Sequence, residues 1–470
     1  MQRSASGAEM DLIEDSFGFR TTVGNTDALE AFDRVRRGVL SHGTDTMSHL
    51  DAALAHDPGF ACAHAVKGLL MLTLARRELV PAAEAALAAA RRSLAERGGT
   101  ARERAYADAL AFWLVGDMTR ASGALDAMLQ NHAADTLAMK LVQAIRFMAG
   151  DQLGMLSSIE RVCSAIAPDH PDLGYVLGCR SFALEEAGEY TEAEKAGRRA
   201  VELAPDDAWG IHAVAHVLEM NRRAGEGIAW INRHQEGWER SNNFRFHVYW
   251  HLALFHLERR EYDIVLDIYD RHSNAVGSDD YRDIANSASL LARLNLEGID
   301  CGSRWQDLAD LAAHRLDDAM LDFADLHFLI SMAGAGRLAE ADRLGMRIAS
   351  AAAPGCCTTT ETAALAARGL MAFAHADYPV AFANLSAAAP SLVSIGGSHA
   401  QRDVFLRIGV EAGLRAGAFG PTELLLRERG RRRPHSDDFA DRRMAAAASH
   451  DAGPARHGSG IRIAAVQNAP

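Results

Sequence analysis

The sequence predicts an all-α protein built from paired helices, and three observations lead to this prediction. Ala, Leu, Glu and Arg dominate every long segment of the 470-residue chain, and these residue types favour helix. Alternating β-branched runs and Asn-Gly or Asp-Gly hairpin turns, which would indicate strands, are few. The helix-length segments arrive in pairs, which is typical of a repeat protein and makes the repeat period the next question.

The repeat is clearest around residue 190, in the run SFALEEAGEYTEAEKAGRRAVELAPDD. Ser181, Tyr190, Ala193 and Pro205 stand there at the spacing of a tetratricopeptide repeat (TPR), a helix-turn-helix unit of about 34 residues. Small Ser181 and Ala193 allow two helices to approach closely, because neither side chain keeps the backbones apart. Tyr190 fills the wedge between the helices, and Pro205 closes the second one.

Similar units follow and precede this one, so the sequence predicts a TPR-like α-solenoid, a right-handed superhelix of helix-turn-helix repeats over residues 25–425. Residues 1–24 form an N-terminal segment ahead of the repeats. The pattern ends in a basic run, RERGRRRP, and then in a stretch rich in Gly, Pro and Ser. We therefore expect residues 426–470 to be a mobile tail.

Charge and hydropathy restrict the partners and the location of the protein. The formal net charge is −13, and the basic run is the main exception, so nucleic acid is not an expected partner. Acidic residues stand where a signal peptide needs basic ones, and no window approaches eighteen uninterrupted apolar residues. We expect a cytoplasmic protein with no membrane span, present as a monomer or a homodimer. The six cysteines lack CxxC spacing and indicate reduced, buried thiols.

Several runs carry a resemblance to a known family. They are GYVLGCRSFALEEAGEYTEAE, YWHLALFHLERREYDIVLDIYD, RDIANSASLLARLNLEG and SIGGSHAQRDVF, together with HAVAHV at residues 212–217. Of these, HAVAHV and the GGSHAQRD within the last run are not part of the generic repeat consensus. On these runs the chain resembles the tetratricopeptide repeat protein 38 family over most of its length. The resemblance implies an all-α repeat fold of poorly defined biochemical role. The sequence departs from the family at Arg222, a turn position where Gly is more usual, which puts the shape of that loop in question.

Two neighbouring segments carry paired histidines. His212, His216 and Glu219 stand at i, i+4 and i+7 of one predicted helix, and His247 and His251 stand at i, i+4 of another. Neutral imidazoles one turn apart can converge on one ion, so the four histidines are a candidate divalent metal site. Glu219 is a further ligand or a general base in this interpretation. The alternatives are hydrogen-bonded core histidines, or two pairs that do not point at each other.

The run IGGSHAQRDVF is the second unusual stretch. Ser398 and Gln401 form a predicted capping box, so a helix should begin there with His399 in its first turn. His399, Arg402 and Asp403 then share a face and offer a proton-transfer group, an anion binder and an orienting carboxylate. The alternative is a simple cap with an Arg–Asp pair that joins neighbouring repeats.

His327 and Trp250 complete the candidate residues. His327, near Asp322 and Asp325, is expected in a buried polar network, or else in contacts that simply join helices. Trp250 and Trp209 lie near the paired histidines in sequence. Aromatic walls beside imidazoles suit a flat heterocyclic ligand, although such rings are more often core.

These observations favour a small-molecule-transforming enzyme of a specialised, bacterial biosynthetic pathway, with a pocket lined by His, Arg and Asp at residues 209–256 and 395–403. Its reaction class is unknown, and the chemistry would be histidine acid–base catalysis or metal-dependent, including oxygen-using, chemistry. The alternative is a non-catalytic TPR scaffold that binds a peptide or partner protein. The expected catalytic residues are His212, His216, His399, Arg402 and Asp403. The expected ligand-binding residues are Glu219, His247, Trp250, His251 and His327. A divalent metal is the one cofactor considered.

Overall fold

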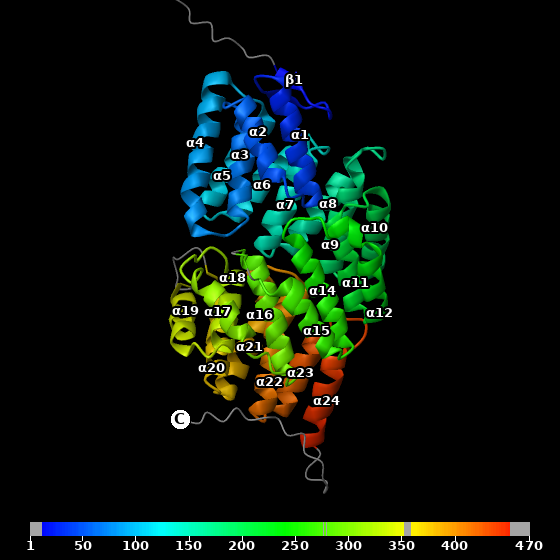
Figure 1. Ribbon diagram of the computed structural model, residues 1–470, viewed down its shortest axis with the longest axis vertical. Helices are drawn as coiled ribbons and strands as arrows, with labels where there is room; N and C mark the ends of the chain where they lie inside the picture. Colours follow the sequence, from blue (N-terminus) through cyan, green and yellow to red (C-terminus); the bar gives the residue numbers. More distant parts are fainter. Residues whose placement is uncertain (1–11, 276, 279, 352–358, 452–470) are drawn as a thin grey trace, which may run out of the picture. The chain divides into compact units, whose positions relative to one another are not determined.

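The computed structural model describes residues 12–275, 277–278, 280–351 and 359–451. Helices make up most of the described chain, in the order seen in Figure 1. The elements of the N-terminal part are β1 (Leu12–Glu14), β2 (Arg20–Thr22), α1 (Thr26–Ser41), α2 (Thr46–His56), α3 (Ala61–Leu72), η1 (Arg77–Leu79), α4 (Val80–Arg97), α5 (Ala101–Leu114), α6 (Met118–Leu129), α7 (Thr136–Met148) and α8 (Gln152–Ala165).

The remaining elements carry the candidate site. The central elements are α9 (Leu173–Glu186), α10 (Tyr190–Leu203), α11 (Ala208–Met220), α12 (Ala224–Arg233), α13 (Gln235–Trp238), α14 (Phe244–Glu258), α15 (Tyr262–Ile268), η2 (Tyr269–Ser273), α16 (Tyr281–Leu296) and α17 (Arg304–Ala313). The C-terminal elements are α18 (Asp322–Gly334), α19 (Leu338–Ala351), α20 (Glu361–Ala374), α21 (Tyr378–Ala388), η3 (Ala389–Ile395), α22 (His399–Arg415), α23 (Phe419–Gly430) and α24 (Asp438–Asp451).

The chain divides into two compact units. Unit 1 comprises Met1–Val217 and Ile231–Arg245, and unit 2 comprises Leu218–Trp230 and Phe246–Pro470. The division falls inside α11, inside α12 and inside α14, each of which is one continuous helix. Residues on one of these helices therefore keep their helical spacing across the division.

Successive helices pack in pairs within each unit, as a TPR-like α-solenoid requires. In unit 1, α9 packs on α10 and α5 on α6; in unit 2, α20 packs on α21 and α22 on α23. The pair α9–α10 follows the expected repeat logic, since the Ser181 hydroxyl donates to the Ala193 carbonyl at 2.7 Å and both residues are fully buried. Tyr190 packs against buried Leu184 and Ala193. The all-α, TPR-like fold predicted from the sequence is confirmed.

The turn after α11 keeps the shape that glycine usually provides. Arg222 has φ +57°, in the left-handed region. The departure from glycine therefore changes the residue and leaves the turn conformation in place, at a cost of about 1–2 kcal/mol for a side chain in that region.

Two features differ from the expected organisation. The N-terminal segment contains an antiparallel pair of short strands, with Ile13 opposite Thr21. The expected mobile tail is instead helical over most of residues 426–451, where α24 follows α23. Phe439 of α24 is buried, at 2% exposed. Two arginines of the basic run, Arg429 and Arg433, are buried in ion pairs and do not form an open basic surface. Residues 452–470 lie outside the described part of the chain.

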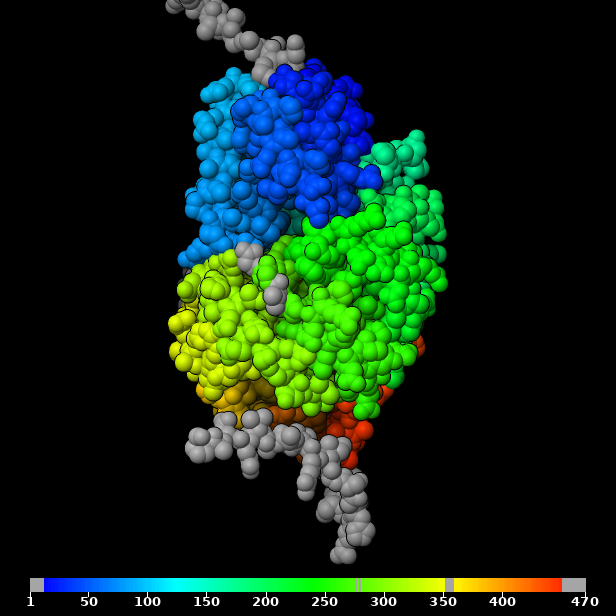
Figure 2. All heavy atoms as spheres, viewed as in Figure 1, coloured from blue at the N-terminus to red at the C-terminus, as the bar shows by residue number. Residues whose placement is uncertain are grey.

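Side chains fill the spaces between the ribbons on the face shown in Figure 2. Within the described residues, one stretch, Tyr378–Ile395 in α21 and η3, is apolar and long enough to cross a membrane by length and composition alone. Its first helix packs against α20 and α22 and buries Ala381 and Leu385. The expected absence of a membrane span stays a prediction.

Candidate functional site

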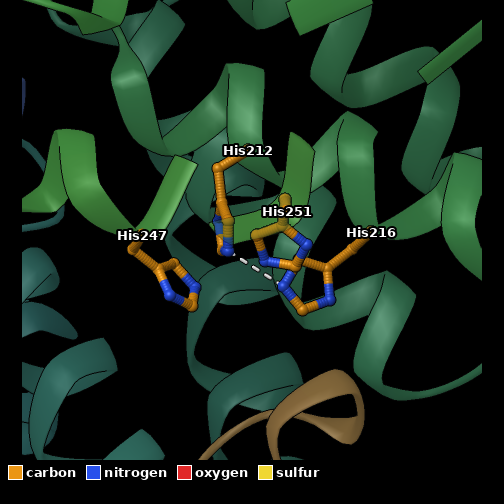
Figure 3. A group of neighbouring side chains, drawn as sticks. All are labelled: His212, His216, His247 and His251. Carbon is orange, nitrogen blue, oxygen red and sulfur yellow. Dashed lines mark hydrogen bonds between the residues drawn. The ribbon is translucent and has the colours of Figure 1, made fainter. Parts of the chain in front are cut away.

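Helix α11 places two imidazoles in direct contact. His212 and His216 are separated by one turn, are both buried, and have Nε2 atoms 2.8 Å apart, so one ring donates its N–H to the other (Figure 3). The other nitrogen of His216, Nδ1, lies 3.6 Å from Oε2 of Glu185, a fully buried carboxylate on α9. His216 therefore has a carboxylate behind it and its Nε2 directed at His212.

Helix α14 repeats this arrangement with its own partners. The rings of His247 and His251 are 4.8 Å apart. Nδ1 of His247 lies 3.0 Å from the Asn286 side-chain oxygen, and Nδ1 of His251 lies 3.4 Å from Oε2 of Glu219. In both rings Nδ1 faces an oxygen atom, so that Nε2 lies on the opposite side of the ring.

Both α14 histidines are held neutral. Burial lowers the pKa of His247 to about 4, with the Arg282 charge adding to the effect and Asn286 opposing it. Burial, together with His247 and Arg293, holds the pKa of His251 well below its usual range. Neutral imidazole is the form that binds a transition metal.

The two pairs on α11 and α14 together supply four nitrogen donors. One nitrogen from each of His212, His216, His247 and His251 lies within 4.8 Å of the others. Glu219 stands three residues after His216 on α11, and its Oε2 lies 3.4 Å from Nδ1 of His251 on α14. A carboxylate at this nitrogen orients the imidazole.

Trp250 forms one wall of the α14 pair. Its indole stacks on His247 with ring centroids 5.2 Å apart and an interplanar angle of 15°. The Arg293 guanidinium lies 5.5 Å from the same ring, and Trp250 itself is fully buried. Trp250 is thus a core residue that fixes the orientation of His247.

The predicted capping box at α22 is confirmed. The Ser398 hydroxyl accepts from the Gln401 backbone N–H, and the Gln401 side chain accepts from the Ser398 backbone N–H. Arg402 Nη2 lies 3.2 Å from Nδ1 of His399, and Arg402 also donates to the Gly397 carbonyl. His399 and Arg402 therefore share a face as expected.

The Asp403 carboxylate pairs with arginines other than Arg402. Arg429 Nε donates to Asp403 Oδ1 at 2.6 Å, and Arg407 Nε donates to Oδ2 at 2.6 Å. Arg429 also donates to Asp437 at 2.5 Å, which joins α22, α23 and the turn before α24. Burial raises the pKa of Asp403, but Arg429 and Arg407 outweigh it and hold that pKa well below its usual range. These contacts match the Arg–Asp pair considered as the structural alternative.

Unit 2 contains a small cavity beside this cluster. Its volume is about 30 Å³, and its walls include Glu219, Arg293, Asp403 and Arg433. A volume of this size has room for one or two water molecules.

His327 lies on α18 and is also buried. Its Nδ1 donates to the Phe323 carbonyl at 2.7 Å, and burial lowers its pKa to about 4. Asp322 accepts from Thr360, and Asp325 pairs with Arg347, so neither carboxylate contacts His327 in the described contacts. His327 thus joins two turns of α18 through this hydrogen bond.

No family model matches the chain. Among solved structures, a human IFIT1 dimer with PPP-AAAA is similar at 11% identity and a TM-score of 0.42, over 93% of this chain and 97% of that one. Yeast Tom70 is similar at 11% identity and a TM-score of 0.35, over 90% of this chain and 96% of that one. Likeness at this level carries no argument about ligands or partners.

Sequence reasoning missed two residues that orient the histidines, Glu185 and Asn286. Both side chains are buried, and a buried polar side chain must find a partner. The sequence shows the two polar residues but not their partners, because His216 and Glu185 are 31 residues apart and His247 and Asn286 are 39 apart.

Proposed function

We propose that this protein is a TPR-like binding scaffold in which His212, His216, His247 and His251 bind one divalent transition-metal ion. The observation that carries the proposal is the outer contact of three imidazoles: Nδ1 of His216, His251 and His247 faces Glu185, Glu219 and Asn286, respectively. Metal-binding histidines almost always present one nitrogen to the ion and the other to such an oxygen.

The donor spacing supports the same proposal. Bonds of about 2.0–2.1 Å place the four nitrogens of a tetrahedral zinc site about 3.4 Å apart. The four donors here lie within 4.8 Å of one another, so modest rotamer changes would bring them to an ion. The donors are all nitrogen, which suits Zn²⁺, Cu²⁺ or Ni²⁺ better than Mg²⁺ or Ca²⁺.

A four-histidine set also favours the scaffold over the enzyme expected first. Catalytic zinc sites keep one coordination position open, whereas closed four-ligand sites are structural. The proposed catalytic role of Asp403 competes with its contacts to Arg429 and Arg407. On this view the ion stabilises the α11–α14 repeat, and the solenoid binds a peptide or partner protein.

Three further expectations belong to this proposal. The runs HAVAHV and GGSHAQRD support membership of the tetratricopeptide repeat protein 38 family. The net charge of −13 supports a partner other than nucleic acid. A cytoplasmic location, as monomer or homodimer, is part of the same proposal.

Metal binding is tested on the full chain, purified without chelator. Co²⁺ titration should give one equivalent with a tetrahedral visible spectrum, and Zn²⁺ should displace it and raise Tm. His216→Ala and His251→Ala should each weaken binding at least a hundredfold. His256→Ala is the matched control, because His256 is on α14 but pairs with Glu261. Sub-stoichiometric binding to the wild type, or equal binding by all variants, would overturn the proposal.

A further inference from the structure

One arginine of unit 2 is buried and donates its hydrogen bonds to neutral groups only. Arg293, on α16, is 2% exposed. Its Nη1 donates to the Ser289 carbonyl at 3.1 Å and to the Ser289 hydroxyl, and its Nη2 donates to the Ala400 carbonyl at 2.6 Å. Its Nε–H donates no hydrogen bond to any of the described residues. A guanidinium stays charged at neutral pH, so a buried cation is left here beside uncharged acceptors.

The carboxylate nearest to Arg293 among its described contacts is already taken by other arginines. Asp403 Oδ2 lies 4.0 Å from Arg293 Nη2, which is too far for a hydrogen bond. The same oxygen accepts from Arg407 Nε at 2.6 Å and from Arg429 Nη2 at 3.1 Å, and Oδ1 accepts from Arg429 Nε at 2.6 Å. Asp403 therefore neutralises its closer partners first and leaves Arg293 without a counter-charge of its own.

The other charges around Arg293 balance one another. Arg293 lines the cavity of about 30 Å³ described above, and six acidic residues line it too. Each of the six pairs with a different arginine: Asp403 with Arg407, Asp437 with Arg429, Glu219 with Arg433, Glu258 with Arg222, Glu297 with Arg443 and Asp438 with Arg442. This one-to-one pairing leaves Arg293 over. A buried charge without a counter-charge is costly, and a bound anion would remove that cost.

We propose that this cavity binds one chloride ion, with the Arg293 guanidinium as its principal ligand. The cavity has room for one or two water molecules, and chloride is only slightly larger than water. Leu254, Phe255 and Phe439 also line it. Their apolar side chains offer no competing hydrogen bonds, so a charge-assisted contact between N–H and chloride is strengthened there.

The bound ion would complete an ion cluster that joins three elements of unit 2. Arg293 is on α16, Asp403 is on α22, and Asp437 is in the turn before α24. A ligand that binds only the folded protein stabilises it in proportion to the logarithm of its concentration. All the residues of this site belong to unit 2, and the inference goes beyond metal binding by the histidines.

Chloride binding is measured directly on the full chain by NMR of the chloride ion, whose line broadens when the ion enters an asymmetric site. The wild type should broaden the line, and bromide should compete. Arg293→Met removes the charge but keeps an unbranched side chain, so it should weaken binding about tenfold or more. Arg293→Lys should restore part of the binding. Arg304→Met is the matched control, because Arg304 is a partly exposed arginine of the same unit that pairs with Asp270.

A second measurement uses the wild type alone and so does not depend on whether a variant folds. Its Tm is compared in sodium chloride and in sodium gluconate at equal ionic strength, so that screening is the same in both salts. Gluconate is too large for the cavity, so Tm should be higher in chloride. Each measurement is made after chelator has removed metal, which keeps a failure of the metal proposal separate from a failure of this one.

Three results would overturn the inference. The first is a wild type with the same Tm in both salts and no broadening of the chloride line. The second is unchanged broadening by an Arg293→Met protein whose circular dichroism shows that it is folded. The third is an equal loss of broadening in Arg304→Met, which would indicate adventitious binding at surface arginines.

Discussion

Oε2 of Glu219 lies 3.4 Å from Nδ1 of His251. The other carboxylate oxygen, Oε1, lies 3.6 Å from Nη2 of Arg433, in the turn before α24. One carboxylate thus links a proposed metal ligand on α14 with a C-terminal arginine. A group that orients a ligand in this way affects metal affinity without touching the ion.

Glu219→Gln should weaken Co²⁺ binding by about tenfold, because the amide keeps an oxygen near His251 but loses the negative charge that strengthens the imidazole as a donor. The measurement is a competition titration with a chromophoric chelator. Glu226→Gln is the control, since Glu226 is exposed and pairs with Arg223. Equal affinity in the two variants would show that Glu219 does not orient His251.

Asp403→Ala should destabilise the protein by ~3–5 kcal/mol, because it leaves Arg429 buried beside a single remaining acid, Asp437. Urea unfolding followed by circular dichroism measures the change. Glu423→Ala is the matched control: its partner Arg427 lies 3.4 Å away and is exposed, so the loss should be below ~0.5 kcal/mol. If Asp403→Ala also lost less than ~0.5 kcal/mol of unfolding free energy, the ion pairs of Arg429 with Asp403 and Asp437 would not hold α24 in place.

Asp207→Asn should change how stability depends on pH. Burial raises the folded-state pKa of Asp207 to about 7, so the protonated carboxyl favours the folded state. Its contribution to the unfolding free energy is complete below the unfolded-state pKa and is lost as pH rises through the folded-state pKa. Between about pH 4 and pH 7 the wild type should lose ~1.4 kcal/mol of unfolding free energy per pH unit from this group.

Asparagine has the size of aspartate but does not titrate in this range, so the variant should lack this slope. Urea unfolding of both proteins at pH 5, 6 and 7 isolates the effect, because other titrating groups cancel in the difference. Parallel pH profiles for wild type and variant would rule out a raised pKa at Asp207.

Arg222→Gly should be more stable than Arg222→Ala by about 1 kcal/mol, because residue 222 has φ +57° and alanine adopts that region at a cost that glycine avoids. Both changes remove the ion pairs of Arg222 with Glu258 and Asp441, so the difference between the variants reports the backbone alone. Equal Tm values would indicate that the turn relaxes to another conformation.

The sequence by itself predicted the helix pairs, the close approach at Ser181 and Ala193, and the capping box at Ser398. Each depends on residues within one or two turns of each other, or on a period that repeats along the chain. It also identified the histidine pairs, because i, i+4 spacing alone places two imidazoles on one helix face.

Only the tertiary structure decided what each histidine faces. Glu185 behind His216, Asn286 behind His247 and Glu219 behind His251 come from other helices, and no local pattern pairs them. The same reason explains the C-terminal helix. The composition of the C-terminal segment indicates mobility. Arg429 nevertheless binds Asp403, 26 residues earlier in the chain, and this ion pair holds the segment in place. Contacts between distant segments depend on how the helices stack. Whether a buried charge stabilises the fold depends on the partner that this stacking brings to it.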